Sequence, residues 1–131
     1  MSEQNEHVYF VNQLYRDFLL PTILGSDAPA ILYWAGKRIT RKYDLSDLDD
    51  LVEFFNMAEF VQLKVVKERR ASMIFSLSGQ AVSDRLASGS KEFSLESGMI
   101  AEAVEEAKQR STEAEIAVDD KKQTVTITTF F

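Results

Sequence analysis

The sequence contains no cysteine, two prolines and a single histidine among its 131 residues. Without cysteine the chain can form neither disulfide bonds nor thiolate metal sites, and it lacks a thiol for nucleophilic catalysis or acylation. The histidine, His7, lies in the polar stretch MSEQNEH. A flexible surface residue is expected there rather than a catalytic base.

The sequence also lacks the short motifs that carry common chemistry. No G-x-G-x-x-G loop, P-loop or H-E-x-x-H motif occurs in it. Glu102, Glu105 and Glu106 could in principle serve acid–base catalysis, but no nucleophile motif accompanies them, and such carboxylates are common on solvated helices. We therefore predict that the protein is not an enzyme and that it holds no metal ion and no cofactor.

Charge and hydropathy exclude further classes of protein. The formal net charge is −6, whereas nucleic-acid binding depends on neutralising phosphates with basic residues. No uninterrupted apolar stretch approaches the roughly 20 residues that span a bilayer. The first residues are polar and acidic, unlike a signal peptide. We expect a cytoplasmic protein that neither binds nucleic acid nor inserts into a membrane.

Length and composition favour one folded domain. A chain of 131 residues can bury a core without disulfides or metals. Its residues are 45% hydrophobic and 27% charged, which is ordinary for a globular protein. We predict a single domain over residues 1–131, of which residues 1–7 are flexible.

The segment from Val8 to Leu20 has the apolar periodicity of a helix. Its apolar surface is wider than one stripe, so the helix either lies between two layers of the protein or meets a second subunit. Burial in the core is the commoner reason for such a surface. If a second subunit covers it, the candidate interface residues are Phe10, Leu14, Tyr15 and Phe18.

A second helix is predicted from Pro29 to Tyr43, and it contains Gly36. A glycine inside a helix costs about 1 kcal/mol relative to alanine, so some group must approach the backbone too closely for a Cβ. A crossing helix is the simpler explanation, and a bound ligand is the alternative. The candidates for close packing or ligand contact are Tyr33, Trp34, Gly36 and Lys37.

Four basic residues lie near the end of this second helix, at positions 37, 38, 41 and 42. They complement the negative end of the helix dipole, which explains them without a partner. An anion site at Arg38 and Arg41 is the alternative, because guanidinium groups bind phosphate or carboxylate in a bidentate manner.

The rest of the chain alternates between helical and strand patterns. A third helix is capped by Ser46 or, alternatively, by Asp44. A hairpin covers 61–77, a short helix capped by Ser78 runs to Leu86, a longer helix covers 95–110, and a second hairpin ends the chain. The predicted fold class is α+β, with a helical layer packed on a four-stranded antiparallel sheet. The predicted element order is ααα-ββ-α-α-ββ.

Several runs of residues carry a family resemblance: LYRDFLLPTILG, ILYWAGKRITRKYDLS, LKVVKERRASMIFSLSG and FSLESGMIAEAVEE. Together they resemble the YslB-like family of small uncharacterised proteins from Gram-positive bacteria, over nearly the whole chain. More remotely, ILYWAGKRI is similar to a motif in the 4-vinyl-reductase-like ligand-binding domains and in the Bet-type subunits of the transport protein particle. Only Gly36 and its neighbours Tyr33, Trp34 and Lys37 match that motif residue by residue.

The remote resemblance implies a binding module that dimerises through its helices and holds an apolar small molecule or an acyl chain. This sequence has no cysteine to carry an acyl group or to ligate zinc, so those properties are not transferred. The leading hypothesis is a homodimeric, non-enzymatic binding module. The alternative is a regulatory adaptor that binds another protein through its helical face.

Overall fold

The structure is a computed structural model that describes residues 9–58 and 61–131. The segment 1–7, expected to be flexible, and His7 within it lie outside the described residues. Helices and strands follow in this order: η1 (Gln13–Leu19), α2 (Leu20–Leu24), η2 (Gly25–Asp27), α3 (Ala28–Tyr43), α4 (Leu48–Met57), β1 (Gln62–Glu68), β2 (Ser72–Ser78), α5 (Gln80–Ala87), α6 (Ser94–Lys108), β3 (Glu113–Asp119) and β4 (Thr124–Phe130). The predicted α+β class and element order are confirmed.

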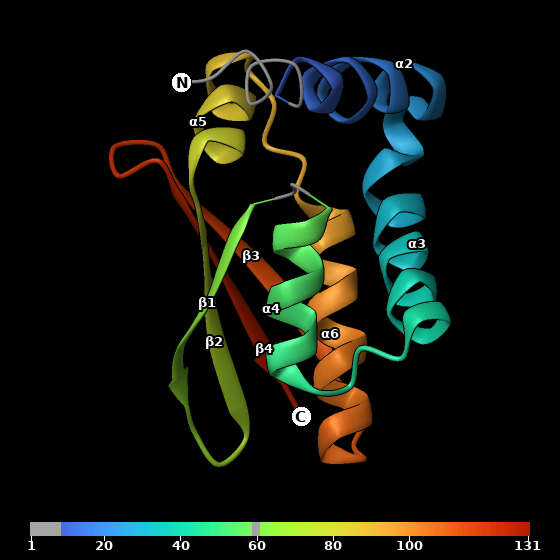
Figure 1. Cartoon of the computed structure of the whole chain (residues 1–131), viewed down its shortest axis with the longest axis vertical. Coiled ribbons are helices and arrows are strands. Elements are labelled where there is room, and N and C mark those ends of the chain that lie inside the picture. Colours follow the sequence, from blue (N-terminus) through green and yellow to red (C-terminus); the bar gives the residue numbers. More distant parts are fainter. Residues whose placement is uncertain (1–8, 59–60) are drawn as a thin grey trace.

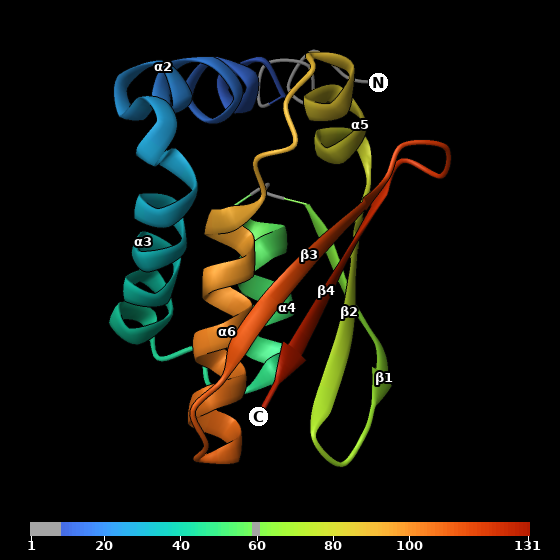
Figure 2. The same cartoon turned by 180° about the vertical axis from the view of Figure 1, so that it is seen from behind.

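The four strands form one antiparallel sheet in the order β1-β2-β4-β3. The helices α4 and α6 cover one face of it, and α3 lies on the far side of α6 from the sheet (Figures 1 and 2). The predicted single helical layer is therefore two helices deep at α6. This position explains why α6 is buried from Ser94 to Val104.

Alternation along the strands decides which side chains reach the core. In β2 the buried residues Met73, Phe75 and Leu77 face the helices, while Ser72, Ser76 and Ser78 face away. The central strand β4 follows the same rule, with buried residues alternating with threonines. The sheet face without helices is thus rich in hydroxyl groups. The core between sheet and helices includes Leu51, Phe55, Phe75, Leu77, Met99, Ile100, Val104, Val125 and Ile127.

The edge strand β1 carries a bulge that interrupts its pairing with β2. Its register shifts between Val65, which pairs with Phe75, and Lys67, which pairs with Ile74. The residue between them, Val66, is exposed. Bulges and lysines on an edge strand discourage pairing with strands of other molecules.

The helices α3 and α6 cross at two glycines that face each other's backbone. A Cβ on Gly36 would collide with the carbonyl oxygen of Leu95 and lie 2.9 Å from the amide nitrogen of Met99. A Cβ on Gly98 would collide with the carbonyl oxygen of Tyr33. Of the two sequence-based explanations for Gly36, the structure shows the crossing helix. The hydroxyl of Thr40 adds a hydrogen bond of 2.9 Å to the carbonyl oxygen of Met99.

The N-terminal arm, which we define as residues 9–24, crosses one end of the molecule. The chain then turns at η2, and α3 runs along the body roughly perpendicular to the arm (Figure 1). Helical segments follow one another without a strand or loop from Tyr9 to Tyr43, but the backbone at Gly25 departs from the helical conformation, with a φ of 62°. By length and composition this path is one weak candidate for a membrane span among the described residues, and most of its surface is exposed. The turn at η2 divides it into two differently directed rods.

Three local expectations from the sequence are wrong. Burial of the arm's apolar surface in the core is contradicted, because Phe10 is 61% and Phe18 is 62% exposed. The cap of α4 is Asp47 rather than Ser46, since the Asp47 side chain accepts a hydrogen bond from the amide of Asp49. The residue that precedes α5 is Gly79 rather than Ser78, and its φ of 105° is a conformation that side chains disfavour.

Replacing Gly36 with alanine tests the helix crossing. By intrinsic helix propensity alone, replacing a glycine inside a helix with alanine would stabilise the helix by about 1 kcal/mol. Because the Cβ would force α3 and α6 apart, we expect Gly36→Ala instead to lower the free energy of unfolding by about 1–3 kcal/mol, as overpacking does. Urea denaturation measures the difference. The control is Ala107→Gly on the exposed side of α6, which should cost only the propensity difference. A stability gain in Gly36→Ala would contradict the close crossing.

Candidate functional site

A buried ionic cluster joins the N-terminal arm to the body. The guanidinium of Arg16 donates two hydrogen bonds to the carboxylate of Glu96, at 2.9 and 3.0 Å. The side chains of Arg16 and Glu96 are 8% and 0% exposed. Paired hydrogen bonds between a guanidinium and a carboxylate also fix the relative orientation of the two groups. The arm is therefore fastened to α6 in one orientation.

The second arginine, Arg85 of α5, completes the cluster. It donates from Nε to Asp17 at 2.6 Å and from Nη1 to Glu96 at 3.2 Å. It also donates to the carbonyl oxygen of Glu92, and its guanidinium lies 4.7 Å from the ring centre of Phe93. Two arginines and two carboxylates, from the arm, α5 and α6, thus meet in a charge-balanced group.

Burial and charge act in opposite directions on these groups. Burial alone would raise the pKa of Glu96, but Arg16 and Arg85 outweigh it and hold that pKa below its ordinary value. For Asp17 burial prevails over Arg85, so the pKa is raised. In Arg85 burial would lower the pKa, but the two carboxylates raise it above its ordinary value. Glu96 is accordingly the carboxylate that the cluster holds most firmly ionised.

The cluster determines which side of the arm faces outward. Arg16 and Asp17 lie in the π-helical segment η1, and both contact the body. Side chains on the other side of the arm are then exposed. We call this set the outer apolar face, and it consists of Phe10, Val11, Leu14, Tyr15, Phe18 and Ile23.

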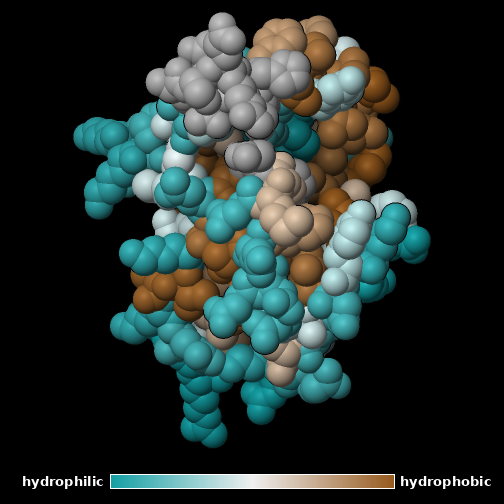
Figure 3. Space-filling view, in the orientation of Figure 1, coloured by the Kyte–Doolittle hydropathy of each residue, from teal (hydrophilic) through white to brown (hydrophobic). Residues whose placement is uncertain are grey.

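The outer apolar face reverses the usual arrangement of a surface helix, whose apolar side is buried and whose charged side is solvated. Phe10, Phe18 and Ile23 are each more than 60% exposed: 61%, 62% and 67%. Figure 3 shows hydrophobic residues gathered over α2 and the first turns of α3, at the upper right. All four candidate interface residues, Phe10, Leu14, Tyr15 and Phe18, are exposed and belong to the outer apolar face. A contiguous exposed apolar patch is typical of an interaction site.

The candidates for close packing or ligand contact in α3 do not converge on one site. Gly36 faces α6, whereas Trp34 is 59% exposed, with the guanidinium of Arg38 at 5.4 Å from its ring centre. The hydroxyl of Tyr33 donates to Glu113 of β3 at 2.9 Å. The ammonium group of Lys37 lies 4.9 Å from the Tyr33 ring centre and 3.7 Å from the Glu113 carboxylate. Two of the four thus join α3 to the sheet edge.

The two candidates for anion binding, Arg38 and Arg41, contact different partners and do not form one site. Arg41 donates to the Glu102 carboxylate at 3.1 Å. Burial, together with Glu102, raises the pKa of the neighbouring Glu106. A second anion would have to compete with these carboxylates at Arg41. Arg38 instead stacks against Trp34.

The ionic cluster escaped the sequence analysis, although signals for it exist. Arg16 and Asp17 interrupt an apolar helix, and Glu96 lies among apolar residues in the run FSLESGMI. Charged residues within such apolar runs indicate paired burial. Sequence separation hides the pairing, because Glu96 is 80 residues from Arg16 and only the tertiary fold joins them.

Comparison with known proteins identifies relatives of the chain. Residues 9–129 match the family described as "Protein of unknown function (DUF2507)". The chain is also 35% identical over 104 residues to the "Uncharacterized protein YslB" of Bacillus subtilis (strain 168). That alignment covers 79% of this chain and 68% of the relative. The resemblance to the YslB-like family is confirmed, and the remote resemblance stays a prediction.

Removing one partner from the buried cluster should be costly. In Arg16→Met the carboxylate of Glu96 loses two hydrogen bonds in a fully buried position, so we expect unfolding free energy to fall by about 3 kcal/mol. Urea denaturation measures this loss. The control is Lys91→Met, which breaks an ion pair with Asp120 that is exposed on both sides and should leave stability nearly unchanged. Equal effects of the two substitutions would show that the cluster does not secure the arm.

The lowered pKa of Glu96 predicts a loss of stability in acid. Its contribution is complete above its ordinary value of 4.5 and is lost as the pH falls through the lower pKa of the folded state. Asp17 has the opposite effect on the pH dependence of stability, because its pKa in the folded state is raised above 3.8 and its protonation in acid favours the folded state. We expect unfolding free energy to fall below pH 4.5, and to fall less steeply in Glu96→Gln. Urea denaturation at a series of pH values tests this, and parallel curves would refute it.

Proposed function

The chain belongs to the DUF2507 family, and we propose that it is a non-enzymatic binding module that pairs with a second copy of itself through the outer apolar face. One observation supports this above the others. The ionic cluster directs the charged side of the arm inward, and so leaves Phe10, Leu14, Tyr15 and Phe18 exposed. An arm folded for its own stability alone would bury those side chains.

The lack of charge on this face favours a second copy as its occupant. Each copy carries a formal net charge of −6, so two copies repel each other least when they meet through uncharged surfaces that keep like charges apart. Every residue of the outer apolar face is uncharged. Under a two-fold axis the same patch lies on both partners, and an uncharged patch then introduces no like-charge contact. Burial of the exposed phenylalanines would drive the association.

A site for an apolar small molecule or an acyl chain remains a secondary part of the proposal. Its candidates in α3 receive little support, because Gly36 packs against α6 while Trp34 faces outward. Non-enzymatic character, cytoplasmic localisation and the absence of nucleic-acid partners and of membrane insertion likewise remain predictions.

The alternative function is a regulatory adaptor that binds another protein through the helical face. The observation that favours it is the exposed Trp34 with Arg38 stacked on it, on the side of α3 away from Gly36. Tryptophan and arginine are enriched among the residues that dominate binding energy at interfaces. Ile31, which is 40% exposed, lies one turn before Trp34 and adds apolar surface.

Charged substitutions on the arm test the homodimer. We expect the native protein to run as a dimer at micromolar concentration in size-exclusion chromatography with light scattering. In the double variant Leu14→Glu, Phe18→Glu four like charges would meet across the two-fold axis, so the dissociation constant should rise by at least about 100-fold, equivalent to about 2.7 kcal/mol. The exposed position of both residues should leave the monomer folded.

The control for that experiment is Met57→Glu, which charges another exposed apolar residue, 78% exposed at the end of α4. It should leave the dimer intact. A native protein that stays monomeric at high micromolar concentration would overturn the homodimer. Dissociation by Met57→Glu but not by the arm variant would place the contact elsewhere. Loss of partner binding in Trp34→Ala would then support the adaptor.

A further inference from the structure

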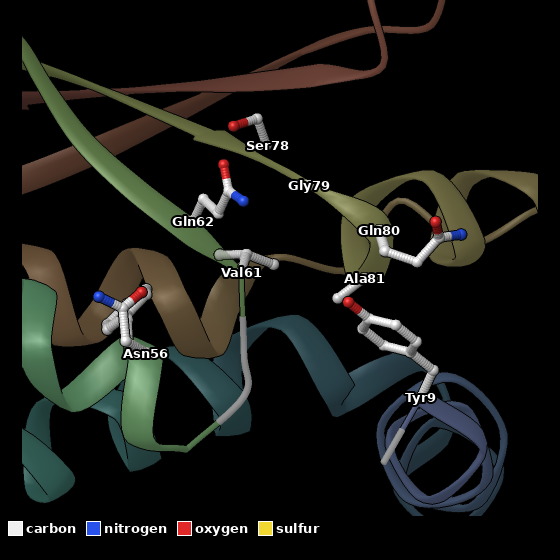
Figure 4. A pocket seen from close by; sticks show the side chains of 9 residues that line it. Tyr9, Asn56, Val61, Gln62, Ser78, Gly79, Gln80 and Ala81 are labelled. Atoms are coloured by element: carbon white, nitrogen blue, oxygen red, sulfur yellow. The ribbon is translucent and has the colours of Figure 1, made fainter. Parts of the chain in front are cut away.

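A small cavity lies at the seam between the helices and the sheet, apart from the outer apolar face. Its volume is about 280 Å³, and it opens where α4 ends and β1 begins, beside the connection from β2 to α5 (Figure 4). The arm contributes only Tyr9, which reaches the cavity from the side toward α5. We call it the seam cavity, and its described lining residues are Tyr9, Phe55, Asn56, Val61, Gln62, Ser78, Gly79, Gln80 and Ala81.

The lining combines an apolar floor with a polar, uncharged rim. Phe55, Val61 and Ala81 are buried and supply apolar contact. Around them lie three carboxamides and one hydroxyl, contributed by Asn56, Gln62, Gln80 and Tyr9, while Ser78, whose side chain faces away from the helices, closes the end at β2. None of the nine described lining residues is charged. A charged ligand would lose its hydration there without gaining a counter-charge from these nine residues, so the described lining favours uncharged molecules.

The rim offers hydrogen-bonding groups that the fold itself does not use. Among the described residues, the carboxamides of Asn56 and Gln62 have no hydrogen-bond partner, and Gln80 uses only its nitrogen, which donates to Asp84 at 2.7 Å. The helix α5 begins at the same place behind Gly79, and no side chain caps its first amides. Donors and acceptors from α4, β1 and α5 thus surround an apolar floor.

We propose that the seam cavity binds an uncharged molecule that presents a planar amide edge, with an N–H group next to a carbonyl oxygen. Carboxamides match such an edge because each offers one donor group and one acceptor side by side. The first amides of α5, which no side chain caps, suit a carbonyl oxygen. The volume of about 280 Å³ is slightly below the range of drug-sized sites and fits one ring or one amide unit. This inference does not depend on the homodimer.

The same amide edge occurs in a free ring molecule and in the main chain of a peptide, so the experiment uses one probe for each. Uracil represents the ring, and N-acetylglycine N-methylamide represents the peptide main chain. Orotate, a ring of the same kind with a carboxylate, is the charged comparison. Each probe is titrated into the full-length protein, and two-dimensional ¹H–¹⁵N NMR follows the side-chain amides of Asn56, Gln62 and Gln80.

We expect saturable shifts at those three carboxamides with at least one neutral probe, and binding of orotate weaker by about tenfold or more. Binding should weaken at least about tenfold in Gln62→Leu, because discrimination by a paired amide is worth that much or more. Asn56→Leu at the exposed end of α4 provides a second variant that removes a rim amide. The control is Lys64→Leu, on the same side of β1 but outside the lining.

Three results would overturn the proposal. One is the absence of saturable shifts with both neutral probes up to their solubility limits. Another is equal binding of orotate and uracil, because the uncharged lining would then not discriminate between a charged and an uncharged ring. The third is unchanged affinity in both Gln62→Leu and Asn56→Leu when their spectra show a folded protein. A protein that is monomeric in light scattering would contradict the homodimer but not ligand binding in the seam cavity. The two proposals can therefore fail separately.

Discussion

The pairing of buried charges between the arm and the body decides which side of the arm is exposed, and therefore where the outer apolar face lies. Arg16, Asp17, Arg85 and Glu96 come from the arm, α5 and α6, and each is paired with at least one of the others, although the buried Nε of Arg16 has no hydrogen-bond partner among the described residues. Buried ion pairs are weak contributors to net stability, because desolvation offsets their attraction. The ion pairs nevertheless restrict the orientation of the arm strongly, because any rotation of the arm would leave a buried charge unpaired. The cluster thus serves to specify orientation more than to stabilise the fold.

The glycine crossing of α3 and α6 provides the frame within which the cluster can form. Gly36 and Gly98 remove the side chains that would keep the two backbones apart. The turn of α6 that carries Gly98 also carries Glu96 and Met99, so the crossing and the ionic cluster share one short stretch of helix. A shift of α3 relative to α6 would also move the arm, because η2 joins the arm directly to α3. Packing at the crossing and pairing at the cluster are therefore mechanically linked.

Much of the architecture could be predicted because its signals are local. A period of two in 61–77 and 114–131 reveals both hairpins, and apolar spacing in 29–43 and 95–110 reveals the two crossing helices. Gly36 indicated a close approach, since a mid-helix glycine has a cost that packing must offset. The caps of α4 and α5 were misplaced by one residue. Neighbouring polar residues compete for such positions, and small differences in backbone geometry decide among them.

The sequence by itself determined the fold class, the element order and the need for a close contact at position 36, because periodicity and glycine placement act over a few residues. Only the tertiary structure decided which side of the arm is buried. Either side of the arm helix could be buried: the apolar side against a core, or the side with Arg16 and Asp17 through ion pairs. The choice depended on partners as far away in the chain as Arg85 and Glu96. The seam cavity is likewise a tertiary feature, since its lining comes from elements that only folding brings together.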